Sequence, residues 1–365
     1  MRIKDLLKRD LSERIEEVIK LNQADEETVY TELTEYVATD RIRDHYRTLL
    51  RAMAEAPAEP HEGIGVWISG FFGSGKSSFA KNLGYVLQNR TVQGHHAAAL
   101  FKQQLQDEEI TRLVDFITLK IPTRVVMFDV SVSTVVRSGT ERMAEIMYRE
   151  LLQALDYAQD YTIAELEFEL EKEGKLEAFT QRCQEQYGLP WTTVRKGAQR
   201  TNRASTILHL MDPTTYPSAD SWEQAATRHE PDITIGGIVT RAFELMALRQ
   251  PGKALAFIID EVGQYVAQSA NKIEDLRAVV EQFGKESKNR VKQRQAVAPV
   301  WIAITSQEKL DEVVDAIGSK RIELAKLQDR FRYRIDLAPA DIREVATRRV
   351  LAKRDEAVPQ LRQHY

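Results

Sequence analysis

The stretch Gly65-Val-Trp-Ile-Ser69 is apolar and runs directly into Gly70-Phe-Phe-Gly-Ser-Gly75-Lys76-Ser77. The second part satisfies the pattern Gly-x₄-Gly-Lys-[Ser/Thr] at every position, and Ser78 to Lys81 continue in residues compatible with a helix. In such a loop the backbone N–H groups and the helix N-terminus face phosphate oxygens. A strand, a loop and a helix in this order therefore predict a phosphate-binding loop rather than an ordinary glycine-rich turn.

The loop pattern assigns a role to each of its members. Lys76 is expected to reach the β- and γ-phosphates of ATP, and the Ser77 hydroxyl is expected to bind Mg²⁺. The residues that we expect to contact the nucleotide are Gly70, Phe71, Phe72, Gly73, Ser74, Gly75, Lys76, Ser77 and Ser78.

Composition excludes several classes of protein. The 365 residues are 43% hydrophobic and 29% charged, which is typical of a globular protein with two or three structural units. A net charge of −4 gives the whole chain no attraction for polyanions. The single cysteine, Cys183, excludes an internal disulfide framework and fits a reducing compartment. Without a membrane-length apolar run or a signal-like N-terminus, the sequence predicts a cytoplasmic protein with no membrane contact.

Four further apolar runs are strand candidates: 124–130, 254–259, 300–304 and 331–337. They alternate with helical patterns, which favours a three-layer α/β core with a parallel sheet. Residues 1–60 are expected to form an N-terminal helical segment, with Thr39-Asp40 at a helix start and a proline-containing linker after it. The ATPase core is expected over 61–340. A helical stretch is expected at 104–120, a helical insertion at about 140–234 with a loop from 212, and the start of a truncated helical lid at 341–365.

The run Leu255-Ala-Phe-Ile-Ile259 ends in two consecutive carboxylates, Asp260 and Glu261. Ligands bind at the carboxyl ends of parallel strands, so this pair predicts a Walker B motif. Asp260 is expected to hold Mg²⁺, and Glu261 to orient or deprotonate the water that attacks the γ-phosphate. The alternative is that the two residues are only a polar connection from the strand to a loop and have no chemical role.

The next apolar run, 300–304, is followed by Thr305, Ser306 and Gln307, each of which could contact the γ-phosphate or the attacking water. We assign the catalytic contact to Ser306 without separating it firmly from the other two. Ser306 equally suits a helix cap.

Arginines stand just before the last strand candidate. Arg330 is the preferred arginine finger, a residue that would reach the γ-phosphate of a neighbouring subunit. Arg321 and Arg332 compete for this role, and a surface ion pair is the alternative for any of the three.

Together the loop at 70–77, the pair at 260–261, the polar residues at 305–307 and Arg330 resemble an AAA+ ATPase. Four segments, 35–39, 68–81, 257–262 and 305–310, closely resemble the N-terminal part of the BrxC family, the large P-loop ATPases of BREX bacteriophage-exclusion systems. The resemblance covers essentially the whole chain, and the loop with its double Phe is its most specific part.

The resemblance implies an ASCE-like P-loop fold with strand order 5-1-4-3-2, ATP with Mg²⁺, and a role in defence against phage beside other BREX proteins. We also expect a homo-oligomer, and because the net charge is negative, any DNA contact would have to be local or made by the assembly. We expect an ATP-driven assembly or remodelling switch. The alternative is a scaffold that binds ATP without hydrolysing it and recruits methyltransferase or DNA partners.

Overall fold

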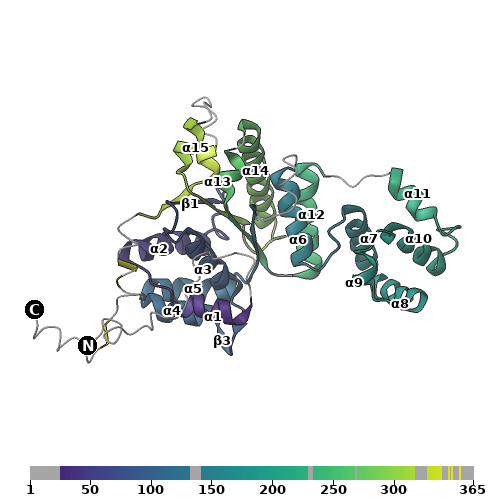
Figure 1. Ribbon diagram of the computed structural model, residues 1–365, viewed down its shortest axis with the longest axis horizontal. Coiled ribbons are helices and arrows are strands. Elements are labelled where there is room, and N and C mark those ends of the chain that lie inside the picture. The colour runs from purple at the N-terminus through teal and green to yellow at the C-terminus, as the bar shows by residue number, and fades with distance from the viewer. Residues whose placement is uncertain are drawn as a thin grey trace, which may run out of the picture. The chain divides into compact units, whose positions relative to one another are not determined.

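The computed structural model describes residues 25–131, 141–228, 233–267, 269–316 and 327–338, with a few positions between 344 and 354. The chain divides into two compact units. Unit 1 comprises Met1–Met143 and Gly252–Tyr365, and unit 2 comprises Ala144–Pro251. Unit 2 is thus inserted between two strands of unit 1 and ends later than the expected insertion at 140–234, because the helix at 235–249 belongs to it (Figure 1).

Unit 1 is built on a five-stranded, all-parallel sheet. Its strands are β1 (Gly65–Ser69), β4 (Thr123–Asp129), β5 (Ala254–Asp260), β6 (Trp301–Ser306) and β7 (Tyr333–Asp336). The spatial order is β4-β5-β6-β1-β7. Numbered along the chain and read from the other edge, this is the expected order 5-1-4-3-2. All five strand candidates are confirmed, with ends that differ by one or two residues.

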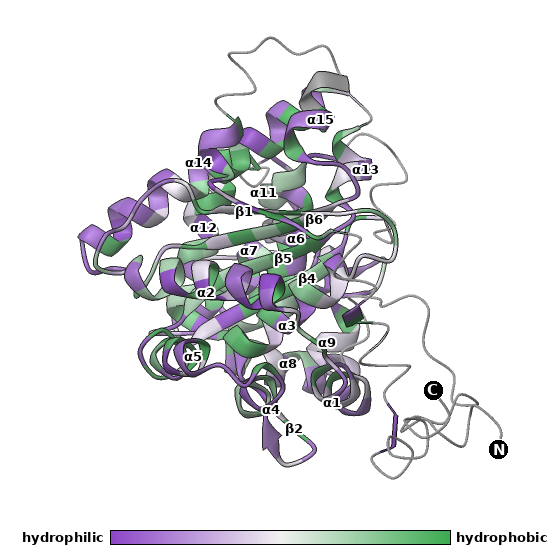
Figure 2. Ribbon diagram, turned by 90° about the vertical axis from the view of Figure 1, so that its left-hand side faces the viewer, coloured by the Kyte–Doolittle hydropathy of each residue, from purple (hydrophilic) through white to green (hydrophobic). Residues whose placement is uncertain are grey.

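Helices cover both faces of this sheet (Figure 2). Alternate residues of the buried strands point to opposite faces, so each strand needs apolar side chains on both sides. On β5, Ala256 and Ile258 join the cluster under α3, whereas the Phe257 ring packs against Phe283 of α14. The helices of unit 1 are α1 (Glu26–Thr34), α2 (Asp40–Glu55), α3 (Lys76–Gln88), α4 (Ala97–Leu105), α5 (Glu108–Lys120), α13 (Val262–Val266), α14 (Ala270–Lys292) and α15 (Leu310–Ala316).

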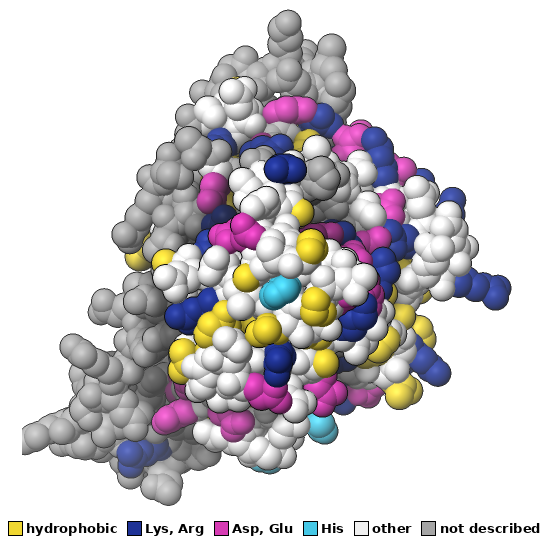
Figure 3. All heavy atoms as spheres, turned by 90° about the vertical axis from the view of Figure 1, so that its right-hand side faces the viewer, with side chains coloured by type: hydrophobic (Ala, Val, Ile, Leu, Met, Phe, Trp, Pro, Cys, Tyr) yellow, Lys and Arg dark blue, Asp and Glu magenta, His cyan; other side chains and the backbone are white. Residues whose placement is uncertain are grey.

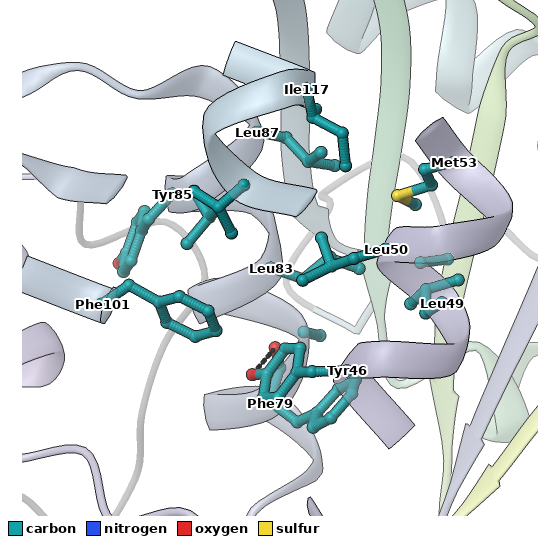
Figure 4. Packing of buried hydrophobic residues seen from close by; sticks show 14 of the residues in the cluster. Tyr46, Leu49, Leu50, Met53, Phe79, Leu83, Tyr85, Leu87, Phe101 and Ile117 are labelled. Carbon is teal, nitrogen blue, oxygen red and sulfur yellow. Dashed lines mark hydrogen bonds between the residues drawn. The ribbon is translucent and has the colours of Figure 1, made fainter. Parts of the chain in front are cut away.

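The N-terminal helices belong to the same hydrophobic cluster as the sheet. Thr39 caps α2 as expected, because its side chain accepts a hydrogen bond from the Ile42 N–H. The Tyr46 ring of α2 stacks on Phe79 of α3 with centroids 4.1 Å apart, and its hydroxyl donates to the Phe79 carbonyl oxygen at 3.1 Å (Figure 4). Helix α2 therefore holds the helix that follows the glycine-rich loop.

Within its described residues, the secondary-structure elements of unit 2 are all helices, joined by loops. Its helices are α6 (Met143–Ala154, which begins at the unit boundary), α7 (Tyr161–Lys172), α8 (Leu176–Tyr187), α9 (Trp191–Val194), α10 (Arg200–Met211), α11 (Ser221–Arg228) and α12 (Ile235–Arg249). One polar group lies deep inside it. The Glu167 carboxylate accepts hydrogen bonds from the Trp191 indole at 2.6 Å, the Ala158 N–H at 2.7 Å and Arg195 at 3.1 Å.

The helical stretch expected at 104–120 is wrong at its start. Gln106 takes a left-handed backbone conformation that ends α4, and Asp107 caps α5 by accepting from the Ile110 N–H. The loop expected at 212–234 contains the helix α11, and the hairpin of β2 (Thr91–Val92) and β3 (His95–His96) was not expected. The expected lid at 341–365 lies almost entirely outside the described residues. No helix in the described part of the chain is long and apolar enough to cross a membrane.

Candidate active site

The glycine-rich loop joins the end of β1 to the start of α3. Gly75 has a φ of 89°, which L-residues with side chains rarely adopt, and it stands directly before the first helical residue, Lys76. Gly70 is required for a different reason, since a Cβ there would lie 2.5 Å from the Ser74 hydroxyl and 2.9 Å from the Leu337 carbonyl oxygen. The sequence thus folds locally into a tight loop that opens a helix, as predicted.

Lys76 lies buried inside the loop. Its ammonium donates a hydrogen bond to the Phe71 carbonyl oxygen at 3.1 Å, and the Ser74 N–H donates to the same carbonyl at 3.1 Å. Burial lowers the pKa of the Lys76 ammonium, while Glu261 and Asp260 act in the opposite direction. The loop therefore holds a cation close to two carboxylates of another element.

The carboxylates come from the carboxyl end of β5. Asp260 is only 3% exposed, and Ser77 of α3 lies close enough to its carboxyl group to lower the pKa of that group. Strands β1 and β5 are separated in the sheet by β6, so the contact is made from the first turn of α3 across the carboxyl edge. The structure thus brings together Lys76, Ser77, Asp260 and Glu261, as the sequence predicted.

Burial raises the pKa values of both carboxyl groups in this pair. For Asp260, the hydrogen bond from Thr305 and the nearby Ser77 side chain oppose the rise. For Glu261 the neighbouring Asp260 adds to the rise, whereas Lys76 opposes it. The Glu261 backbone is left-handed, with a φ of 57°, and the residue stands just before α13. A carboxylate with a raised pKa is a better proton acceptor than an ordinary Glu.

The three polar residues at the end of β6 lie differently. The Thr305 hydroxyl donates to Asp260 Oδ1 and accepts from the Glu261 N–H at 3.0 Å. Gln307 lies close enough to Glu261 to lower the pKa of its side chain, and this side chain accepts a hydrogen bond from the Gln264 amide at 3.2 Å. Ser306 points the other way, because its hydroxyl accepts from the Glu308 N–H at 3.2 Å and lies against Gly263 of α13.

The preference for Ser306 as the catalytic contact is therefore not supported by its surroundings. Neighbouring strand residues face opposite sides of a sheet, and it is Thr305 that shares a side with the acidic pair. Ser306 instead makes a local hydrogen bond within the turn after β6, which resembles the helix cap that we gave as its alternative role.

Arg330 lies far from the loop, at the end of the sheet where the strands begin. A Cβ on Gly65, at the beginning of β1, would lie 2.6 Å from the Arg330 carbonyl oxygen, so Arg330 stands near the amino ends of the strands. Its guanidinium lies 3.4 Å from Glu62 and 3.5 Å from Glu281. The structure does not bring Arg330 to the loop of its own chain.

The two competing arginines give no clearer candidate. The Arg332 guanidinium lies 5.9 Å from the centre of the Tyr333 ring, just before β7. Arg321 lies outside the described residues. An arginine finger in this chain therefore stays a prediction about a neighbouring subunit.

The remaining loop residues differ in exposure. The side chains of Phe71 and Phe72 are 43% and 76% exposed, whereas Ser74 is buried and Ser78 is half-buried in the first turn of α3. The Ser74 hydroxyl has no hydrogen-bond partner among the described groups. A polar, buried and unpaired atom inside a glycine-rich loop fits a ligand that brings hydrogen-bonding oxygens.

Sequence reasoning missed Asp129 as a member of the site. Asp129 is the last residue of β4 and is paired in register with Asp260. Its carboxylate accepts from the Ser131 N–H at 2.7 Å and adds to the rise in the pKa values of Asp260 and Glu261. The available signal was a carboxylate at the end of an apolar strand run, the same signal that identified Asp260.

The donor set fits Mg²⁺ bound together with phosphates. Mg²⁺ prefers oxygen ligands and is commonly held by one or two protein oxygens and by substrate phosphates. The Ser77 hydroxyl and the Asp260 carboxylate supply such oxygens side by side. No group of three or more His, Cys, Asp or Glu able to hold a metal occurs among the described residues, so the protein alone provides no complete metal cage there.

Comparison of the chain with protein-family models gives no match, and comparison with solved structures gives none either.

Proposed function

We propose that the chain binds ATP with Mg²⁺ in the loop from Gly70 to Ser78 and hydrolyses it. The observation that carries the proposal is the proximity of Ser77 and the Lys76 ammonium to the acidic pair, since Ser77 lowers the pKa of Asp260 and both carboxylates raise that of Lys76. It joins the end of the phosphate loop to the acidic pair, and hydrolysis needs both in one place. Under this proposal, the chain is a P-loop ATPase of the AAA+ type, and its parallel sheet is the core of that fold.

Each residue has a chemical part in this proposal. Lys76 and the loop N–H groups bind the phosphates, and Ser77 with Asp260 holds Mg²⁺, which would neutralise phosphate charge. Glu261 takes the proton from the attacking water, helped by its raised pKa. Thr305 is a positioning residue, because it holds Asp260 through its hydroxyl and Glu261 through its backbone.

We further propose that the chain acts as a nucleotide-driven assembly or remodelling switch in a BREX antiphage complex in the cytoplasm. The support is the resemblance of its four motif segments to the BrxC family. Other BREX proteins and further copies of the chain would be its partners. On the face shown in Figure 3, Lys and Arg side chains are mixed with acidic and apolar ones and form no broad basic patch among the described residues of that face. With a net charge of −4, this favours DNA contact through the assembly.

A nucleotide-gated scaffold that does not hydrolyse ATP is the second candidate. The observation that favours it is that the Arg330 guanidinium already lies close to Glu62 and Glu281, so reaching the phosphates of a neighbouring subunit would require it to leave both carboxylates. Without a second cation at the phosphates, charge developing during hydrolysis would be less well stabilised.

Glu261→Gln separates the two candidates. We expect this variant to bind ATP as tightly as the parent chain and to turn it over about 10²–10⁴-fold more slowly, because the proton acceptor is lost. The measurements are steady-state phosphate release and the mass of the particle with and without ATP. If the parent chain and the variant share the same negligible turnover, the scaffold is the correct reading. If the variant alone stays in a larger ATP-bound assembly, the switch is supported.

A further inference from the structure

Unit 2 contains a groove of about 870 Å³ that the nucleotide site does not use. It is open to solvent and lies between α7, α11 and the start of α12, entirely within unit 2. Its volume is within the range of about 300–1,000 Å³ typical of ligand pockets. Most of its lining is apolar or aromatic: Tyr148, Leu166, Tyr216, Trp222, Ala225, Ala226, Ile233, Gly236 and Gly237.

The polar lining has an excess of negative charge. Glu165, Glu169 and Glu244 surround a single cation, Arg241. Arg241 is held by two of the three, since its guanidinium pairs with Glu165 and lies 2.7 Å from Glu244. Its face lies 4.0 Å from the centre of the Phe168 ring. The carboxylates of the groove thus already hold one guanidinium, whose face lies on the buried Phe168 ring outside the lining.

Of the three carboxylates, Glu169 is the one that does not form a close ion pair with Arg241. Among the described residues its ion pairs are to Arg241 at 4.0 Å and to Lys172 at 3.8 Å, both longer than a hydrogen bond. Its side chain is 45% exposed. Glu169 and the rings of Tyr216 and Trp222 line the same groove, and carboxylates and aromatic faces together attract cations.

The charge of the whole unit points to the same kind of occupant. Residues 144–251 include seventeen Asp and Glu but only eleven Lys and Arg. This excess repels nucleic acid and favours a basic partner. A groove with small residues and aromatic rings suits the apolar face of a polypeptide segment, and helix-in-groove binding is a common form of such recognition.

We propose that the groove between α7, α11 and α12 is a docking site for a basic, amphipathic segment of a partner protein. A Lys or Arg of this segment pairs with Glu169, and its apolar side chains pack on Trp222 and the small residues of α11 and α12. Docking there is independent of the nucleotide site in unit 1.

The probe is a short synthetic amphipathic peptide of Leu and Lys, labelled with a fluorophore and titrated with the full chain. The comparison ligands are a matched peptide of Leu and Glu and a short duplex DNA. We expect saturable binding of one Lys peptide per chain that weakens with salt, and no binding of the Glu peptide. Glu169→Lys is expected to weaken binding of the Lys peptide at least about tenfold, because it places a like charge opposite the ligand.

Glu177→Gln is the control, since Glu177 is an exposed carboxylate on α8 of the same unit outside the groove. It should leave binding unchanged, whereas Glu169→Gln should weaken it. Trp222→Ala should also weaken binding of the Lys peptide. This result counts only if circular dichroism shows the helix content of the parent chain, because the change removes a large side chain from α11. Equal binding by the parent chain and both Glu169 variants would overturn the proposal. Displacement of the peptide by duplex DNA, or self-association of the chain through Trp222, would overturn it as well.

Discussion

Thr305 and Ser306 are neighbours on β6 with hydroxyls in different surroundings, and this difference can be tested. We expect Thr305→Val to lower the rate of ATP hydrolysis at least about tenfold, because Asp260 and the Glu261 backbone lose a hydroxyl that holds both. Ser306→Ala removes only the acceptor for the Glu308 N–H and should cost about 1 kcal/mol of stability with little effect on rate. Turnover under saturating ATP and thermal unfolding measure the two effects. Equal loss of rate in both variants would contradict the placement of Thr305.

The raised pKa of Glu261 has a consequence for the pH dependence of hydrolysis. Glu261 must be ionised to accept a proton, and burial with the nearby Asp260 favours its neutral form. As pH falls, activity should therefore be lost at a higher pH than the ordinary titration of a Glu would give. The measurement is a pH profile of turnover at saturating ATP, with ATP binding followed over the same range. An acid limb at or below the usual Glu range would contradict this role.

At the residue scale, the sequence predicted the positions of residues that belong to known motifs. Lys76, Ser77 and Asp260 lie where the loop pattern and the acidic pair place them. The sequence could not separate Ser306 from Thr305, because the side of β6 that each residue faces depends on its pairing with β1 and β5. The surroundings of Arg330 could not be predicted, since Glu62 is far away in sequence.

Among the elements, α7 to α9 of unit 2 depend on one buried carboxylate. Glu167 is 1% exposed and accepts from the Trp191 indole, the Ala158 N–H and Arg195. We expect Glu167→Ala to lower the stability of unit 2 by about 3 kcal/mol, because these donors and the Arg195 charge lose their acceptor. Chemical denaturation followed by tryptophan fluorescence and circular dichroism gives the measurement.

The same variant tests the division of the chain into units. Because Glu167 belongs to unit 2 and the loop residues to unit 1, ATP binding by Glu167→Ala should remain unchanged below its unfolding transition. An unaltered denaturation midpoint would contradict the importance of the buried carboxylate. Loss of ATP binding in the folded variant would contradict the independence of the ATP site in unit 1 from the fold of unit 2.

At the scale of elements, strands were easier to predict than the helices between them. The β5 and β6 strands are unbroken apolar runs, and such runs are typical of parallel strands that are buried on both faces. The break between α4 and α5 was missed because it depends on a left-handed conformation at Gln106, which the sequence does not demand. Helix α11 was missed because Pro, Thr, Ser and Asp surround it, and these residues favour loops.

For the whole molecule, the alternation of strands and helices predicted an α/β sheet, and the family resemblance implied its strand order. The bounds of unit 2 could not be predicted, because α12 joins the insertion through contacts between side chains distant in sequence. Arg249 of α12 contacts Glu171 of α7 at 2.9 Å, for example. The same kind of long-range contact, between Ser77 and Asp260, turns two separate motifs into one candidate site.

The most direct test of the central claim is calorimetric titration of the full chain with Mg²⁺ and ATP. The parent chain should bind one ATP, and Lys76→Ala should bind it about 10- to 100-fold more weakly, because a charged donor to the phosphates is lost. Lys120→Ala, an exposed lysine at the end of α5, is the matched control and should bind as the parent does. ATP binding by Lys76→Ala with the affinity of the parent chain would contradict the assignment of the site.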